Sequence, residues 1–148
     1  MRAGLIAAIL SVVLSPAPAP AQTKTVNQAI DEVLGDHVAY ERLILAARKA
    51  VAAHDAAGVA ALVRYPIGVT ISGKKRVIRT PDSFISHYDA IVTPSIARAV
   101  SGENYQDLFV NAQGVMFGDG EMWISGVCRD VACTGGAQVK IVAIQSVK

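Results

Sequence analysis

The pattern of apolar residues along the chain changes at Pro66, and this change limits the folds that the chain can adopt. Before Pro66, apolar residues recur every three or four positions, as they do on the buried face of a helix. After it, short β-branched runs alternate with glycine-containing turns, a pattern typical of antiparallel strands. Helices first and strands mostly afterwards predict an α+β domain, with N-terminal helices packed on one face of a curved, mainly antiparallel sheet.

Capping residues mark the predicted helices. Thr25 and Gln28 have the spacing of a capping box, and a Gly-Asp step then separates this first helix from a longer one over residues 37–53. Asp55 is the expected N-cap of a third helix over residues 56–63.

The second half predicts one more long helix among the strands. Residues 67–72 and 76–79 flank a Gly-Lys-Lys turn and predict a hairpin. A helix over 81–92 follows, with Thr80 or Asp82 as its cap, and a shorter one follows after Pro94. Asp119-Gly120 is a strong turn signal. The later strands are expected at residues 108–110, 115–117, 121–124 and 139–144.

Residues 1–21 have the composition of a secretory signal peptide. Met1 and Arg2 give a positive start, the apolar run Leu5–Leu14 follows, and Ala19-Pro20-Ala21 matches the cleavage motif. The apolar run is shorter than the roughly 20 residues that a membrane-spanning helix needs. We therefore expect a periplasmic or secreted mature chain, without stable membrane insertion, that forms one domain over residues 22–148.

Cys128 and Cys133 are the only cysteines, and four residues separate them. In an oxidising compartment such a pair is most simply a disulfide, which stabilises by about 2 kcal/mol in the chain-entropy model. A zinc site would need two more soft ligands, and a redox pair is typically Cys-x-x-Cys at the start of a helix. The formal charge of the chain is only +2, so its charge does not favour binding to nucleic acid.

The order of predicted elements resembles that of the nuclear transport factor 2-like superfamily, the cystatin-like α+β cone shared with ketosteroid isomerase and polyketide cyclases. Residues 54–66 are similar to its short second helix and the exit into the first strand, residues 84–88 to its third helix, and residues 114–124 to its central hairpin. The resemblance covers most of residues 27–147. It implies a conical pocket between helices and sheet, and many secreted bacterial members of this superfamily have no assigned activity.

Five residues are candidates for a site in that pocket. For an isomerase-like member, the resemblance implies a carboxylate base with a tyrosine and a protonated acid as oxyanion donors. Glu121 and Asp89 are the candidate bases, and Tyr40 and Tyr88 are the candidate donors. Strand alternation puts Glu121 on the same face as Trp123, the only tryptophan, so both would line the pocket if this face is the buried one. Otherwise Glu121 is solvated beside a turn. The candidate ligand-binding set is therefore Tyr40, Tyr88, Trp123 and Glu121.

Other polar clusters are ambiguous. The three histidines lie on separate predicted elements without metal-ligand spacing, so we expect neither a metal nor a cofactor. Lys74, Lys75, Arg76 and Arg79 either bind an anionic partner or protect an exposed edge strand from aggregation.

The sequence favours a non-catalytic binding protein, because it contains no convergent set of titratable residues. Such a protein would use the cone pocket or the open sheet face to hold a small apolar ligand or another envelope protein, and a homodimer is one possible form. One alternative is an isomerase, cyclase or dehydratase with a pocket carboxylate. Another is an inhibitor or immunity-type factor of the cell envelope that uses the basic hairpin or the cysteine loop.

Overall fold

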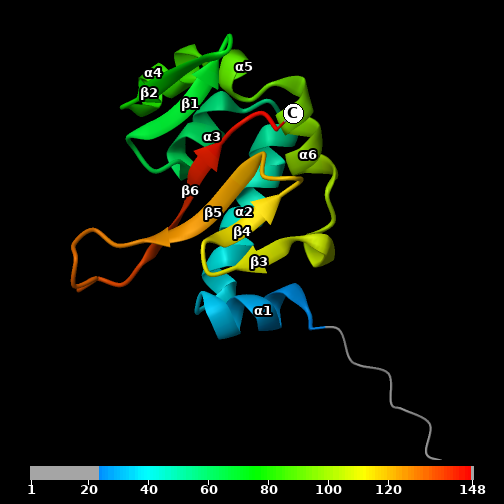
Figure 1. The fold of residues 1–148 in the computed structure, drawn as a ribbon, viewed down its shortest axis with the longest axis vertical. Coiled ribbons are helices and arrows are strands. Elements are labelled where there is room, and N and C mark those ends of the chain that lie inside the picture. The colour runs from blue at the N-terminus through cyan, green and yellow to red at the C-terminus, as the bar shows by residue number, and fades with distance from the viewer. Residues whose placement is uncertain (1–23, 148) are drawn as a thin grey trace, which may run out of the picture.

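The computed structural model describes residues 24–147, and over this range the chain has an α+β fold (Figure 1). The first part contains α1 (Val26–Val33), α2 (His37–Ala52), α3 (Ala56–Leu62) and the hairpin strands β1 (Ile67–Ile71) and β2 (Lys74–Ile78). Next come α4 (Pro81–Ser86), α5 (Tyr88–Ile91), α6 (Pro94–Gly102) and the 3-10 turn η1 (Tyr105–Asp107). The last part contains β3 (Phe109–Asn111), β4 (Gly114–Phe117), β5 (Met122–Val127) and β6 (Gln138–Ile144). The predicted fold class is confirmed at this level.

The described strands form two antiparallel sheets. One is the hairpin β1–β2, and the other has four strands in the order β3-β4-β5-β6. The segment between α3 and β1 joins β6 at an isolated parallel bridge between Val63 and Ile141, where the Arg64 N–H donates to the Ile141 carbonyl at 2.9 Å. The hydrogen bonding is thus that of two adjoining sheets rather than of one curled sheet.

Helix α2 lies across one face of the four-stranded sheet (Figure 1). Apolar residues that recur every three or four positions form the buried face of this helix, and they are Tyr40, Leu43, Ile44, Ala47, Ala50 and Val51. Burying a large apolar side chain stabilises a fold by roughly 1.5–3 kcal/mol relative to leaving it in water. Packing of these residues against the sheet and the neighbouring helices therefore helps to hold the two layers together.

The predicted helix caps are confirmed. The Thr25 hydroxyl accepts a hydrogen bond from the Gln28 N–H at 3.3 Å, and the Gln28 side chain accepts one from the Thr25 N–H at 3.0 Å. The Asp55 carboxylate accepts from the Gly58 N–H at 2.9 Å and begins α3. These bonds satisfy N–H groups that the first turn of a helix leaves without partners.

The predicted helix over residues 81–92 is divided in two at His87. The ring Nδ1 of His87 bonds the Ser83 carbonyl at 2.8 Å, and the Ser86 hydroxyl donates to the Asp82 carbonyl at 2.9 Å. Side chains that bond nearby carbonyls compete with the backbone ladder of the helix. His87 leaves the helical conformation with a ψ of 13°, and α5 starts after it.

Two hairpin turns differ from their predicted positions. The β1–β2 turn is Ser72-Gly73, with φ values of 50° and 75°, so Lys74 and Lys75 belong to β2. A two-residue turn with positive φ at both positions matches the twist of paired strands. Between β4 and β5, Phe117 pairs with Met122, so this turn has four residues, from Gly118 to Glu121, rather than two.

Candidate functional site

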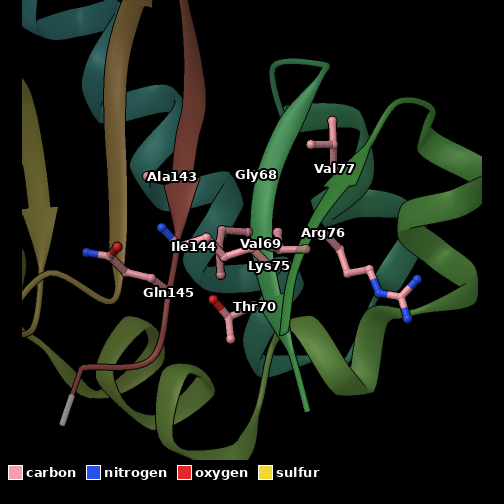
Figure 2. A pocket seen from close by; sticks show the side chains of 9 residues that line it. All are labelled: Gly68, Val69, Thr70, Lys75, Arg76, Val77, Ala143, Ile144 and Gln145. Carbon is pink, nitrogen blue, oxygen red and sulfur yellow. The ribbon is translucent and has the colours of Figure 1, made fainter. Parts of the chain in front are cut away.

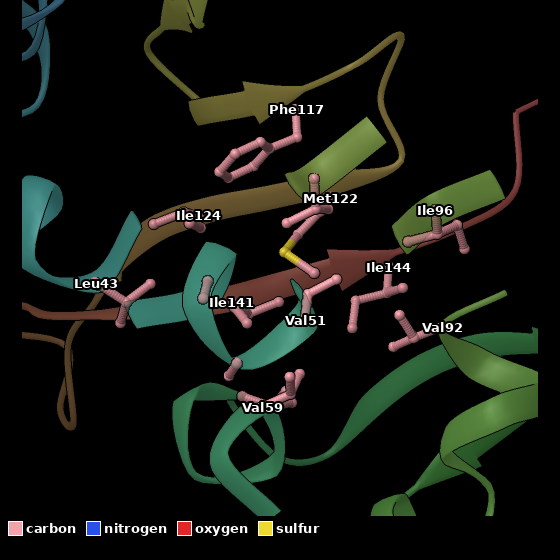
Figure 3. Close-up of a cluster of buried hydrophobic side chains, with 14 of the residues drawn as sticks. Leu43, Val51, Val59, Val92, Ile96, Phe117, Met122, Ile124, Ile141 and Ile144 are labelled. Carbon is pink, nitrogen blue, oxygen red and sulfur yellow. The ribbon is translucent and has the colours of Figure 1, made fainter. Parts of the chain in front are cut away.

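The space between the helices and the four-stranded sheet is filled by apolar side chains (Figure 3). The sheet contributes side chains with no exposed surface, namely Val115, Phe117, Met122, Ile124 and Ile141. From the helices, Ile44, Ala47 and Val59 are also fully buried. This is where the conical pocket was expected, and in this structure it is packed core.

Tyr40 has a structural contact in this core. Its side chain is only 4 % exposed, and its hydroxyl oxygen accepts a hydrogen bond from the Gly126 N–H at 2.8 Å. The bond joins α2 to the far end of β5. The hydroxyl that the isomerase hypothesis assigns to an oxyanion donor is therefore held against the backbone of β5 in the packed core.

Glu121 is a half-buried turn residue that directly precedes β5. One of its carboxylate oxygens accepts from the Asp119 N–H at 2.7 Å, and a carboxylate oxygen of Glu103 accepts from the neighbouring Gly118 N–H at 2.6 Å. The two carboxylates thereby hold the turn between β4 and β5. The predicted face alternation is confirmed for Met122 and Trp123, but the buried face is the one with Met122.

Asp89 lies on the surface beside His54. Its carboxylate is 2.9 Å from His54 Nε2, and its side chain is 83 % exposed. The His54 ring also contacts the ring of Tyr88 edge-on, with 5.0 Å between the ring centres. Burial raises the pKa of the Tyr88 hydroxyl, and the carboxylates of Asp89 and Asp55 raise it further. This His54–Tyr88–Asp89 cluster was not predicted, because His54 lies between α2 and α3, far along the chain from Tyr88 and Asp89 on α5.

Three of the four residues proposed for an isomerase site therefore bond different partners. Tyr40 bonds the backbone at Gly126, Glu121 bonds its own turn, and Asp89 pairs with His54. Within residues 24–147, no three His, Cys, Asp or Glu side chains are grouped so as to hold a metal ion.

Trp123 lies on the face of the sheet that points away from the helices. Cross-strand pairing aligns Phe109 with Met116, Met116 with Trp123, and Trp123 with Ala143. These four residues form an apolar row across β3, β4, β5 and β6, which we call the open-face row. Phe109 is 51 % exposed and the other three are half-buried.

A groove of about 370 Å³ lies beside this row, between the β1–β2 hairpin and the end of β6 (Figure 2). We call it the β1–β6 groove, and its lining residues are Gly68, Val69, Thr70, Lys75, Arg76, Val77, Ala143, Ile144 and Gln145. A second hollow of about 270 Å³ includes Trp123 and shares Ala143 and Gln145 with the groove. The open face of the sheet is therefore hollowed from the hairpin to Trp123.

The backbone explains why the groove is there. The pairing of β5 with β6 shifts register between Trp123 and Ile124, which leaves Val142 as an extra residue in β6. A bulge of this kind bends and twists the strand that contains it. It follows directly after Ile141, the last contact of β6 with the Val63–Arg64 segment. The groove opens beyond that point, and its wall is open at Gly68, where a Cβ would have no other atom within 4 Å.

The predicted disulfide between Cys128 and Cys133 is confirmed, with 4.8 Å between the two Cα atoms. The loop that it closes projects from the ends of β5 and β6 (Figure 1). The Asp130 carboxylate accepts from the Thr134 N–H at 3.1 Å, and these hydrogen bonds lower the pKa of Asp130. Val131, at the tip, is fully exposed.

Of the residues that line the β1–β6 groove, the sequence analysis singled out only Lys75 and Arg76, as members of the basic hairpin. Alternation along the hairpin is a signal that puts Gly68, Thr70 and Val77 on one face. The sequence has no comparable signal that β1 lies beside β6, because the two strands are far apart in the chain and connected through four intervening strands.

Alkaline pH is expected to destabilise the fold through two partly buried tyrosines. Burial raises the pKa of both Tyr65 and Tyr105 to about 12, and both hydroxyls donate hydrogen bonds, to the Ala60 carbonyl and the Asn27 side chain. Above the ordinary tyrosine pKa of about 10, the unfolded chain loses these protons while the folded chain keeps them. The free energy of unfolding therefore falls as the pH rises from about 10 towards 12. Urea unfolding at a series of alkaline pH values measures this slope, which should be smaller in Tyr65→Phe; an equal slope would contradict the assignment.

Among the described residues, no helix has the length and apolar composition needed to cross a membrane. No protein-family model, curated protein sequence or solved structure matches the chain.

Proposed function

We propose that this protein is a non-catalytic binding protein that holds a small ligand in the β1–β6 groove, on the open face of its sheet. The observation that supports this most directly is the contrast between the two faces. The helix-facing side is filled by fully buried side chains, whereas the opposite side has a groove of about 370 Å³. That volume is near the lower end of the range typical of small-molecule sites, roughly 300–1,000 Å³.

The lining of the groove favours a ligand with an apolar body and one anionic group. Gly68, Val77 and Ala143 offer apolar surface, and Val77 is 57 % exposed. Lys75 contributes positive charge, while Thr70 and Gln145 add polar groups. A small aromatic or fatty carboxylate matches this combination, because the cation orients its anionic group while the apolar surface binds its body.

The proposal also includes a nuclear transport factor 2-like fold and export from the cytoplasm. A nuclear transport factor 2-like architecture with a filled cone is supported by the parallel contact of the Val63–Arg64 segment with β6. Export through a signal peptide at residues 1–21 concerns residues outside the described range. It is supported by the Cys128–Cys133 disulfide, which is typical of an oxidising compartment. The isomerase alternative lacks a comparable observation, because Tyr40 and Glu121 bond separate partners and the Asp89 carboxylate is exposed at the surface.

Filling the groove is expected to abolish ligand binding without affecting folding. The probe is 8-anilinonaphthalene-1-sulfonate, which has aromatic rings and one sulfonate and fluoresces when it leaves water. A leucine side chain at position 68 would extend into open space in the groove, since nothing lies within 4 Å of a Cβ there. Gly68→Leu should lower the affinity for the probe about tenfold or more, equivalent to about 1.4 kcal/mol.

Gly102→Leu is the matched control, because Gly102 also has no atom within 4 Å of a Cβ and lies at the end of α6, away from the groove. It should bind the probe like the wild type. Thermal unfolding followed by circular dichroism verifies that both variants fold. Equal probe affinities for Gly68→Leu and Gly102→Leu would refute the groove as the binding site.

A further inference from the structure

We infer that the outer edge of β2 is a second binding surface, which takes an extended acidic segment of another protein as an added strand. This surface lies on the other side of the hairpin from β1, so the inference does not depend on the ligand proposed for the β1–β6 groove. Three observations support it: a free strand edge, a groove beside that edge, and a positive charge that no acidic side chain compensates within the described residues.

The first observation is the free edge. In the two-stranded sheet, β2 pairs with β1 only, so its other side has no strand beside it in the described chain. The two-residue turn makes Ile71 and Lys74 a hydrogen-bonded pair, and the antiparallel ladder alternates from there. Lys74 and Arg76 therefore point their backbone groups towards β1, while Lys75 and Val77 point theirs outwards. Two N–H groups and two carbonyls are thus available to an incoming strand.

The second observation is a hollow of about 340 Å³ between β2 and α4. Its lining residues are Ile71, Arg76, Val77, Ile78, Ser83 and His87. The Arg76 side chain points away from β6 and out of the β1–β6 groove, towards this side of the hairpin (Figure 2). His87 is held in place by its bond to the Ser83 carbonyl at 2.8 Å. A groove between an edge strand and a helix is a known geometry for binding extended peptides, in which backbone bonds give affinity and side-chain pockets give specificity.

The third observation is charge. Lys74, Lys75, Arg76 and Arg79 are all exposed, and none of them is in a salt bridge within residues 24–147. The positive electrostatic field of these four side chains attracts an acidic segment. It disfavours pairing with β2 of a second copy, because such pairing would bring like charges together. The charges that protect this edge from self-association are therefore the ones that select an acidic partner.

A fluorescein-labelled heptapeptide with glutamate at alternate positions and valine or threonine between them tests the inference by fluorescence anisotropy. A peptide with lysine in place of each glutamate is its counterpart. We expect the acidic peptide to bind about tenfold or more tightly than the basic one, and its affinity to fall as the salt concentration rises. Equal affinities of the two peptides would overturn the inference.

Two sets of variants separate strand addition from simple charge attraction. Val77→Pro removes an outward N–H but leaves the β1–β2 ladder intact, and proline is tolerated at such edge positions; Val77→Thr keeps the N–H. Val77→Pro should lower peptide affinity about tenfold, whereas Val77→Thr should not. The double variant Arg76→Glu and Arg79→Glu should abolish binding, while Arg98→Glu with Arg129→Glu, away from the edge, should not.

Amide hydrogen exchange measured by NMR gives an independent readout that does not depend on substitutions. In the free protein, the amides of Lys75 and Val77 should exchange faster than those of Arg76 and Ile78, and the acidic peptide should slow them. Binding without protection of these two amides would contradict strand addition. Gly68→Leu should bind the peptide like the wild type, so failure of the groove proposal and failure of this one are distinguishable.

Discussion

Gly114→Ala should lower the free energy of unfolding by about 3 kcal/mol or more, through backbone strain and overpacking. Gly114 begins β4 with a φ of 141°, a conformation that residues with a Cβ rarely adopt. A Cβ at this position would lie 2.2 Å from the Ile124 carbonyl oxygen. That oxygen belongs to the paired backbone of β5, so it cannot move aside without disturbing the central ladder of the sheet.

Gly68→Ala is the control for this experiment. Gly68 is also a strand residue, but nothing lies within 4 Å of a Cβ there and its φ is outside the left-handed region. Its free energy of unfolding should stay within about 0.5 kcal/mol of the wild type, as for most surface substitutions. Both values come from urea unfolding followed by circular dichroism. If Gly114→Ala were as stable as Gly68→Ala, the close approach of β4 to β5 would be wrong.

Phe117→Ala is expected to cost about 3–5 kcal/mol, the usual range for truncating a buried aromatic side chain. Phe117 has no exposed surface and packs in the cluster between sheet and helices (Figure 3). Its neighbours belong to elements that cannot easily collapse into the space, because β4 is paired on both sides. The lost contacts and the remaining cavity both add to the cost.

The same truncation at Phe109 provides the matched comparison. Phe109 is on the neighbouring strand β3 but on the opposite face, where it is 51 % exposed. Phe109→Ala should cost less than half as much as Phe117→Ala. A cost for Phe109→Ala equal to or larger than that of Phe117→Ala would mean that the two faces of the sheet are assigned the wrong way round.

The parts of the fold that were predictable are those with local causes. The capping box at Thr25, the N-cap at Asp55 and the alternation of Met122 with Trp123 each depend on residues a few positions apart. For the same reason, the disulfide could be predicted from the spacing of its two cysteines. These signals identify elements and the faces that they bury, but not how distant elements meet.

The parts that were not predictable depend on contacts between distant residues. Alternation separates Trp123 from Met122, but it does not say which of them faces the helices. The bulge at Val142 has no signature in the sequence, and this bulge bends β6 and opens the groove. The His54–Asp89 pair likewise depends on how the turn between α2 and α3 packs beside α5. The sequence therefore leaves the cone pocket and the open sheet face as alternatives, and it does not predict a groove between β1 and β6.

The loop between Cys128 and Cys133 differs from the rest of the molecule in how it is held. Its bonds are internal: the disulfide itself, the Asp130–Thr134 hydrogen bonds and the turn in which the Cys133 N–H donates to the Asp130 carbonyl. Because the domain core does not rely on its side chains, selection can alter the residues between the cysteines with little penalty to folding. We therefore expect the residues at the tip of this loop to vary more among related chains than the residues of the domain core.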